Sequence, residues 1–488
     1  MGDLTDGDAA GLARALTRLL EDTRYRVVGG GGSPLVERVT GHVGVRLADL
    51  PNVAVSRPAW QHVNLHLGMQ AYLRAYTPEA EWFGVAGAHR AHEDLVGLLA
   101  GAEQHGMYRL GAVDYATAAA GPDRTVEVVD LGFVATAAPD GSPVVVGLRG
   151  GLQMGPEPTC ELRVLAADRA TAGAVRDEVE RLASEHDVYR GAVLTFDINE
   201  HYGNELVSFL PRPDLASTDV VLPDGVLEVI ERHVVRSATR TERLLAAGQH
   251  LKRGLLLHGA PGTGKTHTVR YLLGRLRGWT VVILSGRALR LLAQATTLVR
   301  RLQPAVLVIE DVDLIAEDRG TYQSSPLLFE LLNRIDGVDA DADVTFLLTT
   351  NRAAELERAL VDRPGRVDLA VEVPLPDAAA RERLLRLYAR GLALDEQHVA
   401  EVVAATEGVT ASFIRELVRR AVLHTLDAED GGGPDGRALP AALAELSGER
   451  SALTRALLGG GAATPSGPRE TRRGFSAVAG APQPGLAP

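Results

Sequence analysis

Apolar residues follow two different periods along this chain, and the changes of period divide it into segments. Leu12, Leu16, Leu19 and Leu20 recur at helical spacing, which predicts a short amphipathic helix over residues 10–26 before a glycine run at 29–32. The segment from 40 to 215 mixes helical and strand-like patterns, so we predict an α+β N-terminal domain there. Its helical patterns lie at 60–76, 90–104 and 170–184, and its β-rich runs lie at 125–136, 143–148 and 160–165.

Between residues 220 and 376, short and strongly apolar runs alternate with helical patterns. Such runs are typical of parallel strands that helices cover on both faces, because each strand is then buried on both sides. Residues 377–428 show only helical patterns and predict a small all-helical lid. The apolar runs of the alternating segment lie at 255–257, 281–284, 306–309, 345–348 and 369–373.

Length and composition add limits to this picture. A chain of 488 residues exceeds the roughly 250 to 300 residues of one hydrophobic core. We expect a helix with a glycine hinge, an α+β adaptor domain, an α/β core, a helical lid and a mostly disordered tail in which one helix spans 438–457. The boundaries predicted for these five parts are 1–39, 40–215, 220–376, 377–428 and 429–488.

The charge and the cysteine content limit which partners and which cellular compartment we expect for this chain. The net charge of −12 argues against a protein that coats nucleic acid, because such binding relies on neutralising phosphates. No apolar run approaches the roughly 18 residues of a membrane helix, so we expect no membrane partner and a cytoplasmic location. Cys160 is the single cysteine, which is consistent with a reducing compartment.

A glycine-rich loop follows the apolar run 255–257 and opens a helical pattern. Its sequence fits the phosphate-binding loop at every specified position, so successive N–H groups are expected to surround a phosphate. Lys265 would reach the β- and γ-phosphates of ATP, and the Thr266 hydroxyl would bind Mg²⁺. Only two of the 51 Lys and Arg residues are lysines, so a lysine retained at 265 marks a site where guanidinium fails. The predicted nucleotide-binding residues are Gly259, Ala260, Pro261, Gly262, Thr263, Gly264, Lys265, Thr266 and His267.

Acidic residues follow the apolar run 306–309. Glu310 and Asp311 come directly after it, which places both carboxylates at the carboxyl edge of the predicted sheet. Acids at this edge can hold a metal ion and polarise an attacking water. A solvated acidic turn is the alternative reading of the same residues.

Six motifs in a fixed order make residues 220–428 resemble a AAA+ ATPase module of the branch with a second region of homology. The resemblance implies a P-loop fold that hydrolyses ATP with Mg²⁺ and assembles into a ring, which acts on a protein client in the manner of a chaperone. The residues that carry it are the loop at 259–266, the acidic motif 304–313, Asp336-Gly337, the polar strand end 349–352, the arginine segment 363–368 and the lid approach 373–377.

The resemblance also gives roles to single residues. Glu310 would lie on the metal side with Thr266, and Asp311 would polarise the water. Asn351 would hydrogen-bond the γ-phosphate or the water, and a turn-capping amide is its alternative role. Arg363 and Arg366 would act as arginine fingers on the neighbouring subunit's nucleotide, and a solvated or intramolecular ion pair is their alternative.

Two departures from the family pattern separate the competing functions. The order Glu310-Asp311 reverses the usual acids and predicts slower hydrolysis or shifted geometry, because the aspartate carboxylate lies one methylene further from the water. The segment 287–303 lacks the aromatic residue with which threading unfoldases grip a chain. Both features resemble the group of the mitochondrial Rieske-protein translocase. The leading hypothesis is a ring ATPase that remodels a protein partner, and the alternative is a nucleotide-gated scaffold with incidental hydrolysis.

Overall fold

The computed structural model describes residues 33–152, 158–198, 205–313, 339, 341–352, 367–427 and 438–447. The predicted helix at 10–26, the glycine run and most of the C-terminal tail lie outside these residues. The chain forms two compact units, residues 1–374 and 375–488. Within the described residues, no helix combines the length and apolarity that would span a bilayer.

The N-terminal part of the first unit contains an antiparallel sheet in the order β1-β7-β6-β5-β2-β3, with β4 also paired to β5. Its central strands read as runs of valine and other β-formers, and both of their faces are buried. The strands are β1 (Asn52–Pro58), β2 (Trp82–Ala86), β3 (Arg109–Gly111), β4 (Asp114–Ala119), β5 (Thr125–Ala137), β6 (Pro143–Leu152) and β7 (Thr159–Leu165).

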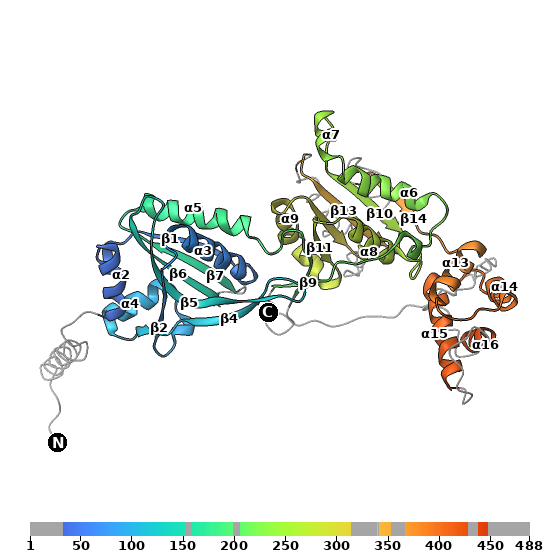
Figure 1. Cartoon of the computed structure of the whole chain (residues 1–488), viewed down its shortest axis with the longest axis horizontal. Helices are drawn as coiled ribbons and strands as arrows, with labels where there is room; N and C mark the ends of the chain where they lie inside the picture. Colours follow the sequence, from blue (N-terminus) through green and yellow to red (C-terminus); the bar gives the residue numbers. More distant parts are fainter. Residues whose placement is uncertain are drawn as a thin grey trace, which may run out of the picture. The chain divides into compact units, whose positions relative to one another are not determined.

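Helices cover both faces of this sheet, which confirms the predicted α+β class (Figure 1). One core lies under α3 and α5, and a second lies under α2 and α4. Asp168 caps α5 by accepting a hydrogen bond from Thr171 N at 2.9 Å. The helices are α2 (Pro34–Val43), η1 (Leu47–Asp49), η2 (Ala59–Gln61), α3 (His62–Tyr76), η3 (Arg90–His92), α4 (Leu95–His105) and α5 (Arg169–Glu185).

A second sheet has the order β14-β10-β13-β12-β11-β8-β9 and is parallel except for β9. Each apolar run predicted between 255 and 373 corresponds to one of its strands, although the last run extends one residue past β14. β8 and β9 come from the range 40–215 that we assigned to the N-terminal domain, so that range supplies two strands to this sheet. The strands are β8 (Val193–Ile198), β9 (Glu205–Leu210), β10 (Arg253–His258), β11 (Thr280–Leu284), β12 (Ala305–Ile309), β13 (Val344–Thr350) and β14 (Leu369–Glu372).

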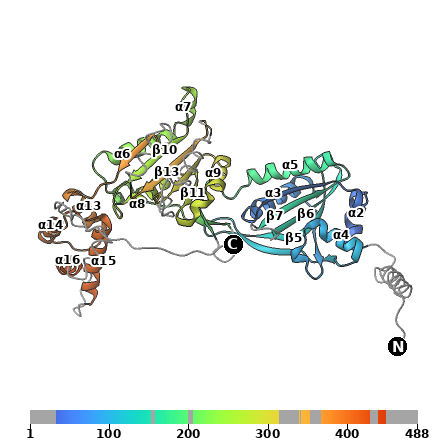
Figure 2. The same ribbon diagram turned by 180° about the vertical axis from the view of Figure 1, so that it is seen from behind.

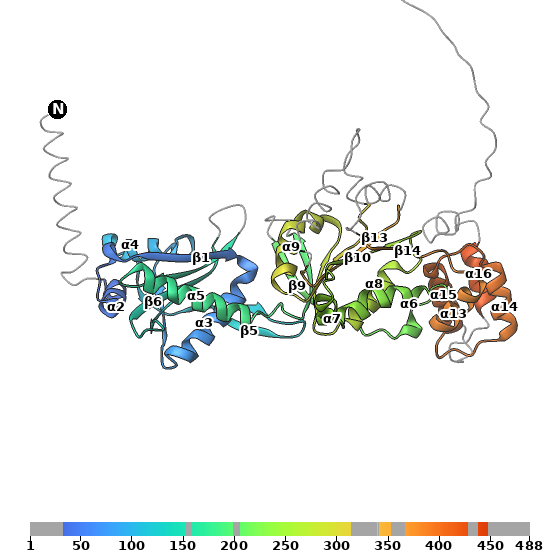
Figure 3. The same ribbon diagram turned by 90° about the horizontal axis from the view of Figure 1, so that it is seen from above.

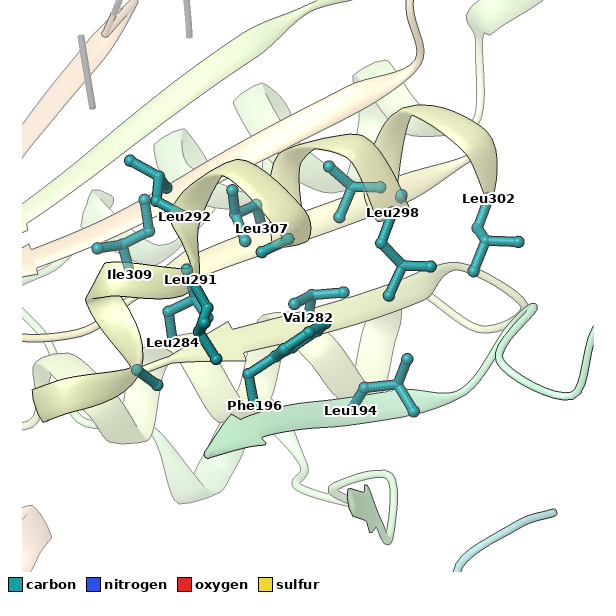
Figure 4. Close-up of a cluster of buried hydrophobic side chains, with 14 of the residues drawn as sticks. Leu194, Phe196, Val282, Leu284, Leu291, Leu292, Leu298, Leu302, Leu307 and Ile309 are labelled. Atoms are coloured by element: carbon teal, nitrogen blue, oxygen red, sulfur yellow. The ribbon is translucent and has the colours of Figure 1, made fainter. Parts of the chain in front are cut away.

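Helix α9 covers one face of the second sheet, and α6 and α8 cover the other (Figure 3). Leu292, Leu298 and Leu302 of the α9 segment pack toward β8, β11 and β12 in a shared hydrophobic core (Figure 4). This arrangement confirms a doubly covered parallel sheet of the P-loop type. The helices are η4 (Ser217–Asp219), α6 (Val226–Glu231), η5 (Arg232–Arg236), α7 (Thr241–Ala246), α8 (Lys265–Arg275), η6 (Gly286–Leu291) and α9 (Leu292–Arg301).

An aromatic cluster joins the two sheets of the first unit. The Trp60 ring packs edge-on against Tyr189 and Phe196, with centroids 5.5 and 5.7 Å away, and Tyr189 stacks on Phe209. Ala120 and Val128, near the turn between β4 and β5, belong to the same hydrophobic core as β8 and α9. The N-terminal sheet is therefore fixed to the second sheet by buried contacts rather than by a bare linker.

The second unit is all helical in its described part, as predicted for the lid (Figure 2). Asp377 caps its first helix by accepting a hydrogen bond from Ala380 N at 2.7 Å. Its helices are α13 (Ala378–Tyr388), α14 (Glu396–Ala405), α15 (Ala411–Asp427) and α16 (Leu439–Ser447).

Candidate nucleotide site

The glycine-rich loop joins the end of β10 to the start of α8. Gly259, Gly262 and Gly264 have φ values of 146°, 77° and 112°, which side chains with a Cβ rarely adopt. A Cβ on Gly259 would also lie 2.2 Å from the Val373 carbonyl oxygen. These two constraints explain why glycine is needed at the first position, where the loop passes close to the end of β14.

Lys265 begins α8 and is only 6% exposed. Its Nζ donates hydrogen bonds to the carbonyl oxygens of Gly259 and Ala260, at 2.8 and 2.9 Å, and to Asn351 Oδ1 at 2.7 Å. Burial lowers the pKa of this ammonium group, and the carboxylates of Asp311 and Asp313 oppose that shift. The loop therefore closes around a compact cation with three acceptors.

The acidic turn after β12 is held by the strands on either side of it. Glu310 N donates to Leu284 O of β11 at 3.0 Å, while Asp311 N donates to Thr349 Oγ1 of β13 at 3.0 Å. Asp311 has a φ of 49°, a left-handed conformation that aspartate tolerates better than most residues. Both neighbouring strands thus fix where the two carboxylates lie.

Glu310 lies beside the start of α8, where its carboxylate hydrogen-bonds the side chain of Thr266. Burial raises the pKa of Glu310, with a further contribution from the Asp311 charge, while the Thr266 hydroxyl and Arg270 lower it. A hydroxyl and a carboxylate in contact are hard oxygen donors of the kind that Mg²⁺ takes beside phosphate oxygens. The pair therefore fits the metal-side position predicted for it.

Asn351 connects the loop lysine to the acidic turn. Its Oδ1 accepts from Lys265, and its Nδ2 donates to Asp311 Oδ1 at 3.2 Å. The side chain therefore lies between the predicted phosphate-binding cation and the predicted water-polarising acid. A polar group in this place can contact both the γ-phosphate and an attacking water.

Asp313 was not among the predicted site residues, although the structure gives it a positioning role. It is 7% exposed, and its Oδ1 accepts from Thr350 Oγ1 at 3.0 Å and from Asn351 N at 3.1 Å. The sequence held one signal for this link, since three consecutive polar residues, 349–351, stand at the end of the apolar strand β13 and directly after it. Those polar groups need partners once they are buried.

Other predicted residues are placed differently. The His267 imidazole hydrogen-bonds the Asp219 carbonyl oxygen at 2.9 Å, so a nucleotide contact from this residue would have to come from its backbone. Thr263 Oγ1 donates to Ala260 O at 2.9 Å and braces the loop from within. Arg363 and Arg366, with the Asp336-Gly337 motif, lie outside the described residues.

Comparison with known proteins agrees with this geometry. Residues 255–375 match the AAA family. That family is described as the ATPase family associated with various cellular activities, and the matched span runs from within β10 to the first residue of the second unit. The AAA resemblance drawn from the motifs is therefore confirmed for this segment.

The chain is also similar to several curated proteins. It is 28% identical to 26S proteasome regulatory subunit 6A of Encephalitozoon cuniculi, over 48% of this chain and 62% of that protein. It is 33% identical to ATP-dependent zinc metalloprotease FtsH 2 of Symbiobacterium thermophilum, over 43% of this chain and 37% of that protein. It is 30% identical to the proteasome-activating nucleotidase of Methanoregula boonei, over 46% of this chain and 54% of that protein. The similarity thus spans about half the length of these relatives.

Proposed function

We propose that this chain binds and hydrolyses ATP with Mg²⁺ in an oligomeric ring, and that turnover drives rearrangement of a protein partner in the cytoplasm. The observation that carries the proposal is the hydrogen-bonded series Lys265–Asn351–Asp311, which joins the glycine-rich loop to the acidic turn. Such a series brings a phosphate-binding cation, a polar sensor and a general base into one site. The AAA match of residues 255–375 supports the same proposal.

Each residue then has a chemical task. Lys265 neutralises charge on the β- and γ-phosphates, and the loop N–H groups donate to phosphate oxygens. Thr266 and Glu310 would hold Mg²⁺, which would supply positive charge that offsets the charge of the phosphates. Asp311 accepts the proton of the attacking water, and Asn351 orients that water toward the γ-phosphate.

We propose further that Arg363 and Arg366 complete the site of the adjacent subunit. Arginine fingers in trans stabilise charge that grows in the transition state, and this role requires a closed assembly. A mixing experiment tests the idea, because Arg366→Ala and Asp311→Asn subunits should each be inactive alone. Mixed assemblies should recover part of the turnover, because some interfaces then pair an intact finger with an intact acid. If every mixture stayed inactive although the subunits co-assembled, the trans arrangement would be wrong.

A protein client is the partner class we favour. The relatives named above include proteasome-activating and proteasome regulatory proteins, and the charge of −12 disfavours nucleic acid. Threading by an aromatic loop is not proposed, because residues 287–303 contain no aromatic and most of them form η6 and α9, which pack into the core. Because of this feature and the Glu310-Asp311 order, we propose a likeness to the Rieske-translocase group. The relatives named above belong to other groups of proteins.

A nucleotide-gated scaffold is the second candidate, and the reversed acids favour it. In that case ATP binding fixes an assembly, and hydrolysis is slow and incidental. Proteins captured by the Asp311→Asn variant in the presence of ATP supply the partner for a direct test. Phosphate release that rises several-fold on adding the captured partner supports the remodelling function. Release that stays slow at all partner concentrations supports the scaffold.

A further inference from the structure

A cavity of about 280 Å³ lies in the first unit between η2 and α9. The residues that line it come from the end of β1 and η2 on one side and from one face of α9 on the other. None of them belongs to the nucleotide site. The lining residues used below are Arg57, Pro58, Trp60, Thr297, Leu298 and Arg301.

One wall of the cavity is aromatic and rigid. The Trp60 indole is held edge-on by Tyr189 and Phe196, and the Tyr189 hydroxyl donates to the Trp60 carbonyl oxygen. Leu298 and Pro58 add apolar surface to the same cavity. A flat aromatic ring can therefore pack on a surface that needs no rearrangement, which lowers the entropy lost on binding.

The other wall carries positive charge. The side chains of Arg57 and Arg301 are 44% and 37% exposed, and no carboxylate is among the described residues that line this cavity. Arg57 is bonded to Glu180, whereas Arg301 donates to Asp187 at 2.8 Å and to Gln61 at 3.3 Å. Among the described residues, all of these bonds use Nη2, so Nε and Nη1 of both arginines remain as donors.

The acids that anchor the two arginines lie on their far side. A smaller cavity of about 90 Å³ shares Arg57 and Arg301 with the first, and it contains Glu180 and Asp187. The Asp187 side chain is 2% exposed and also accepts from Asn64 Nδ2 at 2.9 Å, which fixes its position. The carboxylates thus hold the guanidinium groups in place and leave the first cavity with cations but, among its described lining residues, no anion.

We propose that this cavity binds a small aromatic carboxylate. Its ring would pack on Trp60, and its carboxylate would accept hydrogen bonds from Arg57 and Arg301, the geometry that guanidinium groups favour. Arg57 lies near the end of β1 in the N-terminal sheet, whereas Arg301 is the last residue of α9. The buried face of α9 packs on β12, the strand that precedes Glu310. The bound acid would therefore tie the N-terminal sheet to the helix that supports the acidic strand. This inference does not depend on ATP hydrolysis.

Calorimetric titration of the full chain with 2-naphthoate tests the proposal, with 2-naphthamide as a neutral match and cyclohexanecarboxylate as a non-aromatic one. The expected result is saturable binding of one naphthoate, with a Kd at least about tenfold higher for the other two compounds, because each lacks one half of the recognition.

Two variants locate the binding. Arg57→Gln removes one cation of the cavity, and the ion pair that Arg57 forms with Glu180 is solvent-exposed. Thr297→Trp fills the cavity from the exposed face of α9. Each should raise the naphthoate Kd at least about tenfold without lowering the thermal midpoint. Arg46→Gln, a control in an exposed pair with Asp49, should leave the Kd unchanged. The proposal is overturned if the parent chain shows no saturable binding, or if both cavity variants bind as tightly as the parent.

Discussion

Asp313 offers the sharpest test of how the candidate site is positioned. It is not one of the predicted catalytic or nucleotide-binding residues, yet its carboxylate accepts from both the Thr350 hydroxyl and the Asn351 backbone N–H. The Asp313→Ala substitution removes the acceptor of both hydrogen bonds at once. Asn351 then loses the anchor that places its side chain between Lys265 and Asp311.

The expected size of the effect follows from these two bonds. Each buried donor that loses its acceptor costs about 1 to 3 kcal/mol, and the Thr350 hydroxyl can rotate toward another acceptor. We therefore expect Asp313→Ala to lower the free energy of unfolding by about 2 to 4 kcal/mol. The less severe Asp313→Asn keeps an amide oxygen in place and should lose about 1 kcal/mol.

Two measurements separate positioning from simple stability. Urea unfolding of the nucleotide-free chain gives the change in free energy, and phosphate release below the unfolding range gives kcat and KM. We expect Asp313→Ala to lower kcat at least about tenfold with a smaller change in KM, and Asp313→Asn to recover most of it. Asp339→Ala is the matched control, because Asp339 lies in an exposed pair with Arg300 and should cost under about 1 kcal/mol. The reasoning is refuted if Asp313→Ala keeps the parent's kcat, or if Asp313→Asn is as impaired as the alanine variant.

Three further predictions concern single groups. Burial and the Asp311 charge raise the pKa of Glu310, so its carboxylate loses its proton at a higher pH than an ordinary glutamate does. Turnover at limiting Mg²⁺ should therefore rise with pH as Glu310 ionises, and a pH–rate profile that stays flat in the acidic range would contradict this. Lys265→Arg should reduce turnover on the order of 100-fold, since a planar guanidinium cannot replace a buried ammonium with three acceptors, and parental phosphate release would show the reasoning to be wrong. Asp343→Asn should lower the free energy of unfolding by about 3 to 5 kcal/mol, because Arg253 is 5% exposed, pairs with Asp343 at 2.9 Å and would be left without its counter-charge. Urea unfolding measures this loss, and a loss as small as that of Asp339→Asn would exclude the effect.

The sequence predicted those parts of the site whose chemistry is local. The loop at 259–266 needs glycines at fixed spacing between a strand and a helix, and Glu310 and Asp311 follow directly on a buried strand. Each pattern is contained within a few neighbouring residues of the chain. For the same reason, the cap at Asp168 and the polar end of β13 follow from neighbouring residues alone.

Contacts between distant segments were not predictable in this way. β8 pairs with β11, 88 residues later by the register Val193↔Val281, and its short apolar run carries no mark of that partner. Trp60 and Asp187 likewise look ordinary in the sequence, yet the fold places both at the junction with α9. Asp313 has its positioning role only because β12 and β13 lie side by side.

The central claim is that this chain hydrolyses ATP through Asp311 at a site built on Lys265. Steady-state phosphate release and equilibrium ATP binding, measured on the parent and on Asp311→Asn, test that claim most directly. We predict that the variant binds ATP as tightly as the parent while its turnover falls at least about 100-fold, because the acceptor for the water's proton is lost. Equal steady-state rates in the two proteins would contradict the account.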